Sequence, residues 1–320
     1  MKRIVSKPLL YAINALIALL FLTTAASAQR TASVSGNWNS TATWGGSAVP
    51  TSTDAVTIAN GITVTVNVSD AVCASVQIGN ASGTAVLQFN ASSQLTVSGV
   101  VTVGQNSGGT NRFGQLTMTS GGNLICRGLA VGFSSSSNTF TPGSGTVELT
   151  ATNTLPSSTF TSFNTLNITG GTTTLGRALS ISALTIGSGT TFTPGSNLIT
   201  LSGDLVNNGT VTSGSGGLTI SGTATQSVGS FTTTGTVSMT KTAGTATFTG
   251  NISGAGLTIN GTGGTLNLGT GLNHTFSSTW TRTAGTLNGG SSTMNLSATS
   301  STISGTGGTF TAGTGNVSWS

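Results

Sequence analysis

The amino-acid sequence predicts an all-β protein folded as a right-handed parallel β-helix, a solenoid in which each turn of the chain (a coil) contributes a few short strands. Three observations support this. The 320 residues include 64 Thr as well as many Val and Ile, and these β-branched residues favour strands. With 48 Gly and only five Pro, the composition indicates short strands separated by tight turns. A short strand pattern also recurs at nearly constant spacing, which is typical of a stacked array.

The recurring pattern is an apolar residue, any residue and a second apolar residue, followed within two positions by Gly. It begins at Val76, Val101 and Leu129, at nearly equal intervals along the chain. Alternation over three positions indicates a strand, and the Gly permits the turn that follows. No segment keeps an apolar period of about 3.6 residues, which excludes a helical solenoid. A string of immunoglobulin-like sandwiches is the alternative. It is disfavoured because such domains bury aromatic anchors. The single Tyr, Tyr11, lies in the signal peptide predicted for residues 1–28, so the mature chain contains none.

The second half carries a different repeat, Thr-Phe-Thr followed by Pro or Ala and then Gly. It occurs at 139–143, 191–195 and 309–313, at uneven spacing. We therefore predict regular coils over 59–138 and looser solenoid repeats over 139–320, with turn insertions causing the unevenness. The polar segment 134–138 is compatible with a boundary between two solenoids and equally with one continuous β-helix.

Residues 1–28 predict a signal peptide. Three basic side chains lie at positions 2, 3 and 7, an apolar stretch covers 9–22, and Ala-Ser-Ala at 26–28 supplies a cleavage pattern. A membrane-spanning helix needs about 20 apolar residues. This run is shorter, so cleavage is favoured over an uncleaved anchor. We expect a secreted or outer-cell-surface protein that begins at Gln29 and does not span a membrane.

Charge is scarce in this sequence. Removing the signal peptide takes three of the nine basic residues, and the remaining six against four acidic residues lower the net charge from +5 to +2. These six are scattered singly and form no stripe that would neutralise phosphates, so we expect no nucleic-acid partner. Low charge alone is compatible with disorder, but the abundance of β-branched residues argues against it.

Residues 29–58 depart from the repeat and contain Trp38 and Trp44 close together. Two interpretations fit these rings. They belong to a cap that covers the strand edges at the open end of the solenoid, or they form a platform on which sugar rings stack. We favour the cap and keep Trp38 and Trp44 as the candidate ligand-stacking residues.

This segment also carries a motif: Gly-x-Trp at 36–38, Thr-Trp-Gly-Gly at 43–46, Pro-Thr at 50–51 and Asp-x-Val-x-Ile at 54–58. It resembles the opening of the G8 domain and of related bacterial secreted β-strand-repeat proteins, over residues 36 to about 130. The remainder is similar to repeats of large bacterial surface proteins and adhesins. The resemblance implies an extracellular, noncatalytic or binding module built on a parallel β-helix. It transfers no functional residue, because the matching positions are turns and caps.

The two cysteines are predicted to be free, although an oxidising compartment favours disulfides. Cys73 lies three positions before Val76 and Cys126 three before Leu129, so both take the same position in their coils. The intervening coil places Ser98 between them. Two strand spacings separate the cysteine backbones by about 9.6 Å, and a disulfide needs Cα atoms within about 6.8 Å.

Catalytic chemistry finds little support. Parallel β-helices that cleave polysaccharides need paired carboxylates or a base beside Arg or Lys. The acidic residues are widely spaced, and we interpret them as turn residues that bond their own backbone: Asp54, Asp70, Glu148 and Asp204. His274 is the only histidine, and we interpret it as a polar loop residue. We therefore predict no catalytic residue, no metal site and no cofactor.

These observations favour a structural, adhesin-like surface module whose partner is a surface polysaccharide or another cell-surface protein. The alternative is a carbohydrate-binding or carbohydrate-active β-helix. Ice binding through ranks of Thr is disfavoured, because pairs such as Thr63 with Thr65 and Thr245 with Thr247 are unevenly placed. Residues 317–320 look like an open strand, which predicts covering by a partner, end-to-end self-association or continuation of the chain.

Overall fold

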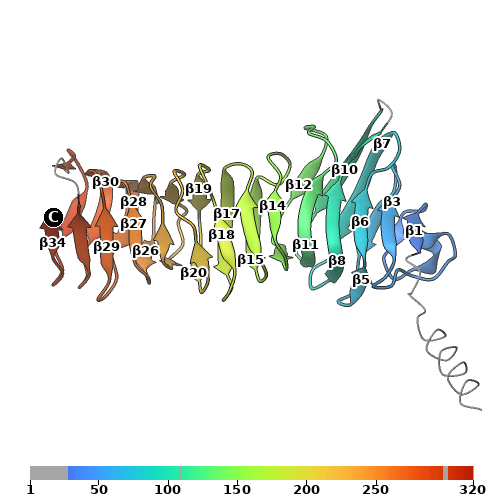
Figure 1. Ribbon diagram of the computed structural model, residues 1–320, viewed down its shortest axis with the longest axis horizontal. Coiled ribbons are helices and arrows are strands. Elements are labelled where there is room, and N and C mark those ends of the chain that lie inside the picture. Colours follow the sequence, from blue (N-terminus) through green and yellow to red (C-terminus); the bar gives the residue numbers. More distant parts are fainter. Residues whose placement is uncertain (1–27, 108–109, 298–301, 320) are drawn as a thin grey trace, which may run out of the picture.

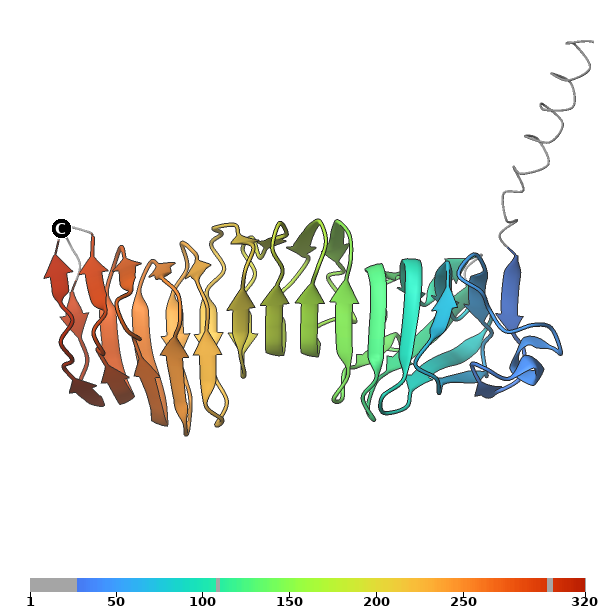
Figure 2. The ribbon, with the colours of Figure 1, turned by 90° about the horizontal axis from the view of Figure 1, so that it is seen from below.

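The computed structural model describes residues 28–107, 110–297 and 302–319, and it confirms an all-β solenoid of parallel strands with about 12 turns. Figures 1 and 2 show the coils stacked side by side along one long axis. Within the described residues the only helix is a 3-10 turn, η1 (Thr41–Trp44). The predicted signal peptide lies outside the described residues, except for Ala28.

Each coil passes through three strand positions, which we call face 1, face 2 and face 3. Six long strands turn a corner and therefore serve two faces. Face 3 is built from β5 (Ala71–Cys73), β8 (Gln94–Val103), β11 (Asn123–Val131), β13 (Thr146–Leu149), β15 (Ser162–Ile168), β17 (Leu179–Ile186), β20 (Leu205–Asn207), β23 (Gln226–Val228), β26 (Thr245–Phe248), β28 (Leu257–Asn267), β30 (Trp280–Asn288) and β33 (Thr309–Thr311).

Faces 1 and 2 follow the same order but are divided into successive ladders. Face 1 contains β1 (Gln29–Ala32), β3 (Ala55–Ile58), β6 (Ser75–Ile78), parts of β8 and β11, then β14 (Asn153–Leu155), β16 (Thr172–Leu175), β18 (Thr191–Thr193), β21 (Thr210–Val211), β24 (Phe231–Thr232), β27 (Ile252–Gly254), β29 (Asn273–Phe276), β31 (Thr293–Leu296) and β34 (Val317–Trp319). Face 2 contains β2 (Gly36–Asn37), β4 (Thr63–Val66), β7 (Gly83–Phe89), β10 (Thr110–Thr117), β12 (Thr139–Thr141), parts of β15 and β17, then β19 (Ile199–Leu201), β22 (Leu218–Ile220), β25 (Val237–Met239), parts of β28 and β30, and β32 (Ile303–Ser304). A short strand, β9 (Gln105–Ser107), pairs antiparallel with β10.

Face 3 shows that the described coils form one continuous stack. Its parallel ladder runs from β5 to β33 without a break. The pairing of β11 with β13 crosses the polar segment at 134–138, since Cys126 pairs with Leu149. The solenoid core is therefore continuous there.

The coil lengths agree with the sequence in the first half and differ in the second. Val101 pairs with both Val76 and Leu129, so each predicted step from one motif to the next is one coil. Later coils are shorter: Leu149 pairs with Ile168, and Ile168 pairs with Ile186, so less chain separates successive partners. The coils beyond 139 therefore contain less chain than the coils of the first half.

The uneven spacing of the Thr-Phe-Thr motif follows from where its copies lie in the fold. Its three copies lie on three different faces: 139–141 in β12 on face 2, 191–193 in β18 on face 1 and 309–311 in β33 on face 3. The motif therefore marks a strand followed by a corner and does not mark a fixed place in the coil. Gly143 and Gly195 follow two of these strands with φ of 50° and 61°, a conformation that Gly adopts without strain.

The core runs the length of the solenoid, because alternate strand residues point inward and stack on their partners. On face 3, Leu95, Leu124, Val147, Leu166 and Leu184 form one buried column. Burying an aliphatic side chain of this size contributes about 1.5–3 kcal/mol. Repetition of such columns in every coil holds the stack together.

The cap is shorter than the predicted 29–58. β1 pairs with β3 and β2 with β4, so 29–37 and 55–58 already belong to the ladders. Residues 38–54 are the ones that leave the repeat, and they contain η1 at one end of the stack (Figure 2).

Candidate functional site

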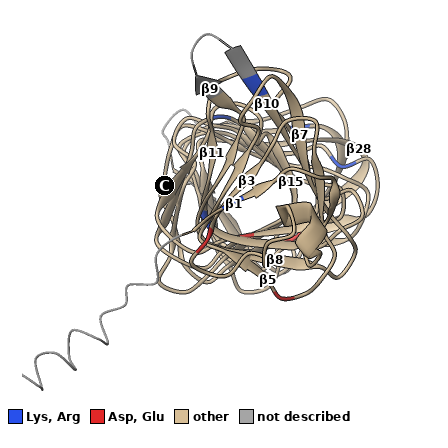
Figure 3. Ribbon diagram, turned by 90° about the vertical axis from the view of Figure 1, so that its right-hand side faces the viewer, with Lys and Arg blue, Asp and Glu red and all other residues tan. Residues whose placement is uncertain are grey.

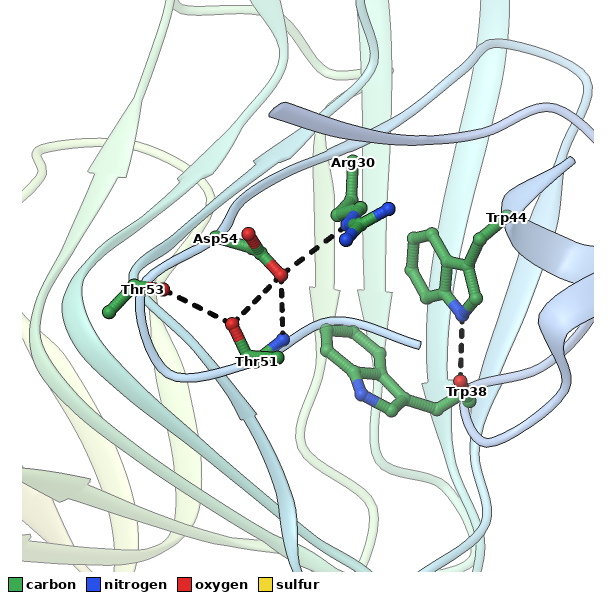
Figure 4. Close-up of polar contacts among 6 residues, drawn as sticks. All are labelled: Arg30, Trp38, Trp44, Thr51, Thr53 and Asp54. Atoms are coloured by element: carbon green, nitrogen blue, oxygen red, sulfur yellow. Dashed lines mark hydrogen bonds and ion pairs between the residues drawn. The ribbon is translucent and has the colours of Figure 1, made fainter. Parts of the chain in front are cut away.

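The two cap tryptophans pack against each other inside the fold (Figure 4). Their ring centroids are 5.2 Å apart with the planes at 74°, an edge-to-face contact. The indole N–H of Trp44 donates to the carbonyl oxygen of Trp38 at 2.8 Å. Only 2% of Trp38 and 3% of Trp44 is exposed. A sugar-stacking platform needs an accessible ring face, so the structure does not support that interpretation, and the cap interpretation accounts for both rings.

Asp54 fixes the loop that leads from the cap into β3 (Figure 4). Its Oδ2 accepts hydrogen bonds from the backbone N–H and the hydroxyl of Thr51, both at 2.9 Å, and lies 3.4 Å from Nε of Arg30. Burial alone raises the pKa of this carboxyl, but the bonds from Thr51 and Arg30 outweigh burial and lower the pKa below its usual 3.8. The predicted turn role of Asp54 is confirmed.

Cys73, Cys126 and the residue stacked between them form a column, here called the cysteine column. The predicted alignment of the two cysteines is confirmed, but the identity of the residue between them was wrong. Cys73 and Cys126 are both free and buried, and two strand spacings separate them. The residue between them is Val97, which pairs with both, and not Ser98. The prediction was off by one because Val97 and Val101 are four positions apart, whereas Cys73 and Val76 are three apart.

Lys241 occupies an unexpected place, because its side chain is fully buried at the corner that follows β25. Its ammonium donates to the carbonyl oxygens of Ser221 at 3.2 Å and Ala224 at 2.7 Å, and to Oε1 of Gln226 at 2.6 Å. Loss of solvation lowers the pKa of this amine below 10.5. Three acceptors satisfy the three ammonium donors, and these bonds join two coils.

His274 also differs from its prediction. It lies in β29 and is fully buried, whereas the sequence suggested a polar loop residue. Nδ1 accepts the backbone N–H of Ile252 at 3.1 Å, so Nε2 carries the proton and donates to the carbonyl oxygen of Leu268 at 2.8 Å. Phe248 packs against the ring at 5.1 Å. Burial lowers the pKa of His274 below 6.5, so the imidazole is a neutral core group.

The remaining acidic residues do not gather into a site. Glu148 accepts a hydrogen bond from the hydroxyl of Thr169, and Asp204 accepts the backbone N–H of Ser227, both at 2.8 Å. Each bond reaches the adjacent coil, which corrects the expectation that these residues bond their own backbone. Asp70 is exposed. Within the described part of the chain no three His, Cys, Asp or Glu residues lie close enough to hold a metal ion. Figure 3 shows the few charged residues spread around the solenoid.

Hydroxyl groups, in contrast, are arranged with high regularity on the outer faces. The Thr pairs at 63 and 65 and at 245 and 247 lie on different faces, in β4 and β26, which explains their uneven spacing. Face 1 carries a Thr-x-Thr sequence in four consecutive coils, at 152–154, 172–174, 191–193 and 210–212. Thr pairs therefore align over these four coils, although the pairs at 63 and 65 and at 245 and 247 do not align with each other.

The fold and these features define a β-solenoid with an apolar core that encloses a few hydrogen-bonded polar side chains, and with ordered ranks of hydroxyl groups on its surface. No protein family, curated protein or solved structure matches the chain. No helix among the described residues has the length and apolar character needed to cross a membrane.

Proposed function

We propose that this protein is an extracellular, noncatalytic, adhesin-like rod that binds a surface polysaccharide or a cell-surface protein through many weak contacts. The observation that carries this proposal is the face 3 ladder, which joins every coil from β5 to β33 into one body. Such a rod repeats its outer faces at a fixed spacing of about 4.8 Å.

Two further observations support a repeated-contact role. The outward strand residues are dominated by neutral hydroxyl side chains, and the charged residues are isolated (Figure 3). A neutral, repetitive face gains affinity when many weak contacts act together, because each additional contact is intramolecular once the first has formed. The signal-peptide pattern and the resemblance of residues 36 to about 130 to secreted bacterial repeat proteins favour the extracellular location.

Two measurements on one panel test the proposal. The chain beginning at Gln29 is displayed on beads at increasing density and incubated with insoluble polysaccharides and with bacterial cells. Bead retention and release of soluble sugar are both recorded. We expect retention that rises steeply with display density, without sugar release.

Two outcomes would overturn the proposal. One is the absence of retention on every surface at the highest density. The other is sugar release that is lost in Asp54→Asn or Asp70→Asn, which would establish the carbohydrate-active alternative. Because Asp54 is buried, Asp54→Asn can lose activity through misfolding. Asp70 is exposed, so a loss of sugar release in Asp70→Asn would not be explained by misfolding. A separate measurement addresses location: N-terminal sequencing of secreted protein should begin at Gln29.

A further inference from the structure

The Thr-x-Thr sequences of face 1 form a two-dimensional array, here called the threonine array. Its eight members are Thr152, Thr154, Thr172, Thr174, Thr191, Thr193, Thr210 and Thr212. Strand pairing puts six of them in register: Thr172 pairs with Thr191 and Thr191 with Thr210 in one rank, and Thr154, Thr174 and Thr193 follow one another in the other. Thr152 and Thr212 lie at the ends of the two ranks. The four strands form a separate sheet, whose members β14 and β18 lie near the middle of Figure 1.

The spacing of the array follows from strand geometry. Neighbouring strands are about 4.8 Å apart, and alternate residues along one strand are about 6.6 Å apart. The hydroxyls and methyls therefore repeat in two directions at once. A ligand that uses all of them must be a rigid body with comparable repeats in both directions.

The side chains beneath the array hold it in place. Phe192 is fully buried between Thr191 and Thr193, and Thr173 is fully buried between Thr172 and Thr174. Nδ2 of Asn153 donates to the hydroxyl of Thr173 at 3.1 Å, which joins the first two coils from inside. Because β-branched side chains are restricted at χ1, the outward hydroxyls and methyls are preorganised on this support.

Most hydroxyls of the array are free to meet a ligand. That of Thr212 donates to the carbonyl oxygen of Phe192 at 3.4 Å, and that of Thr152 accepts the N–H of Thr172 at 3.2 Å. The other six have no protein partner within the part of the chain that the structure describes. No charged residue occurs in β14, β16, β18 or β21.

The other two faces lack this combination. Face 2 carries a long rank of Ser and Thr, but in its second rank the hydroxyls of Ser221 and Thr240 donate to the carbonyl oxygens of the preceding coil. On face 3 the second rank is interrupted by Asn267 and Asn288, whose side-chain oxygens accept turn N–H groups. The threonine array differs from these surfaces because both of its ranks consist of Thr alone over four consecutive coils.

We propose that the threonine array binds ice. Lattice planes of ice present oxygen atoms at repeats close to the two spacings of the array, and each hydroxyl can donate to and accept from a lattice water. The Thr methyl groups fill the spaces between these hydroxyls with small apolar surface. A sugar-binding surface would instead offer exposed aromatic faces, and the one aromatic residue in these strands, Phe192, points inward. This inference does not depend on the adhesin-like function proposed above.

The test uses the chain beginning at Gln29 and measures thermal hysteresis, the faceting of single ice crystals and inhibition of ice recrystallisation. Two variants place a long charged side chain in the array, Thr193→Lys and Thr174→Lys. The matched control is Thr200→Lys, which changes the same residue type at similar exposure in the same coil as Thr193 but on face 2. Far-UV circular dichroism and melting temperature establish that all variants fold. Depletion onto crystalline cellulose and chitin is measured in parallel.

We expect ice activity in the unmodified chain and in Thr200→Lys, with loss of that activity in Thr193→Lys and Thr174→Lys. Absence of ice activity in the unmodified chain overturns the proposal, whether or not the chain binds the crystalline polysaccharides. Equal loss in Thr200→Lys overturns the assignment to face 1. Retention of full activity in both array variants overturns it as well.

Discussion

Lys241 and Gln226 face each other inside the solenoid, with the ammonium nitrogen 2.6 Å from the amide oxygen. Nε2 of Gln226 donates in turn to the carbonyl oxygen of Gly203 at 2.8 Å. Within the described residues the one ion pair is Arg30 with Asp54, so Lys241 has no carboxylate partner there. A buried charge without a counterion is costly unless hydrogen bonds replace its water. The three oxygen acceptors thus determine whether this corner can contain a lysine.

We predict that Gln226→Met destabilises the protein by about 1–3 kcal/mol, because it leaves the buried ammonium with two acceptors. Chemical denaturation measures this loss. Lys241→Met in the same background is the control: when both residues are replaced, the apolar pair should recover part of the loss. Additive effects of the two changes would show that their side chains do not interact.

The burial of His274 predicts that the folded protein loses stability in acid. Burial lowers its pKa in the folded protein below the 6.5 of an exposed histidine, so the unfolded chain takes up a proton first as pH falls. The stability contribution is therefore present above pH 6.5 and is lost progressively as the pH falls below that value. His274→Gln keeps one acceptor and one donor for Ile252 and Leu268 but does not titrate. The variant should lose less stability than the wild type between pH 8 and pH 5, and an equal loss would contradict the prediction.

The strand alternation in the sequence predicts that both of these buried polar residues point inward. Val237, Met239 and Lys241 are alternate residues along β25 and its extension. His274 and Phe276 are alternate residues in β29. Alternation places residues of one phase on one side of the sheet, so both polar residues belong to the inward phase. From the sequence we treated Lys241 only as one of six singly scattered basic residues and His274 as a polar loop residue, whereas the strand alternation places both inside the solenoid.

Face assignment was harder to predict than strand position. The strands around Val76, Val101 and Leu129 were predicted in the correct register, since their short motifs recur once per coil. Later motifs occur on any of the three faces, and the turn lengths that separate them are set by local corner geometry. The alignment of the threonine array could therefore not be predicted from the sequence, because the sequence does not specify which face each Thr-x-Thr segment occupies.

The cap tryptophans predict a local stability effect. Trp44→Ala should cost about 3–5 kcal/mol, because it removes a buried ring and its hydrogen bond to Trp38. In a stack with nearest-neighbour contacts, the loss should fall on the first coils. Hydrogen exchange should accelerate in β1 and β3 and remain slow in β22. Val34→Ala is the control, since Val34 is 53% exposed in the same region. Uniform acceleration along the whole solenoid would show that the cap acts globally.

The cysteine column predicts two distinct thiol behaviours. Burial raises the pKa of Cys126 to about 12 and that of Cys73 further, so neither thiol should react with iodoacetamide in the folded protein. Ser98→Cys places a thiol at an exposed position, which should be alkylated. Val97→Cys places one a single strand spacing from both cysteines, so mild oxidation should form an internal disulfide. A disulfide from Ser98→Cys and none from Val97→Cys would restore the register predicted from the sequence.

The pairing of Ile168 with Ile186 predicts that one complete coil can be removed. Deleting residues 169–186 joins Ile168 directly to Gly187, so each later strand meets the strand one coil earlier in its original register. Deleting only 169–177 removes half a coil and leaves the later strands opposite the wrong face. We expect the whole-coil deletion to melt cooperatively, with an unfolding enthalpy lower by about 0.7 kcal/mol per residue removed. The half-coil deletion should lose cooperative melting and expose apolar surface to a hydrophobic dye. Calorimetry distinguishes the two, and equal behaviour of both deletions would mean that nearest-neighbour stacking does not hold this fold together.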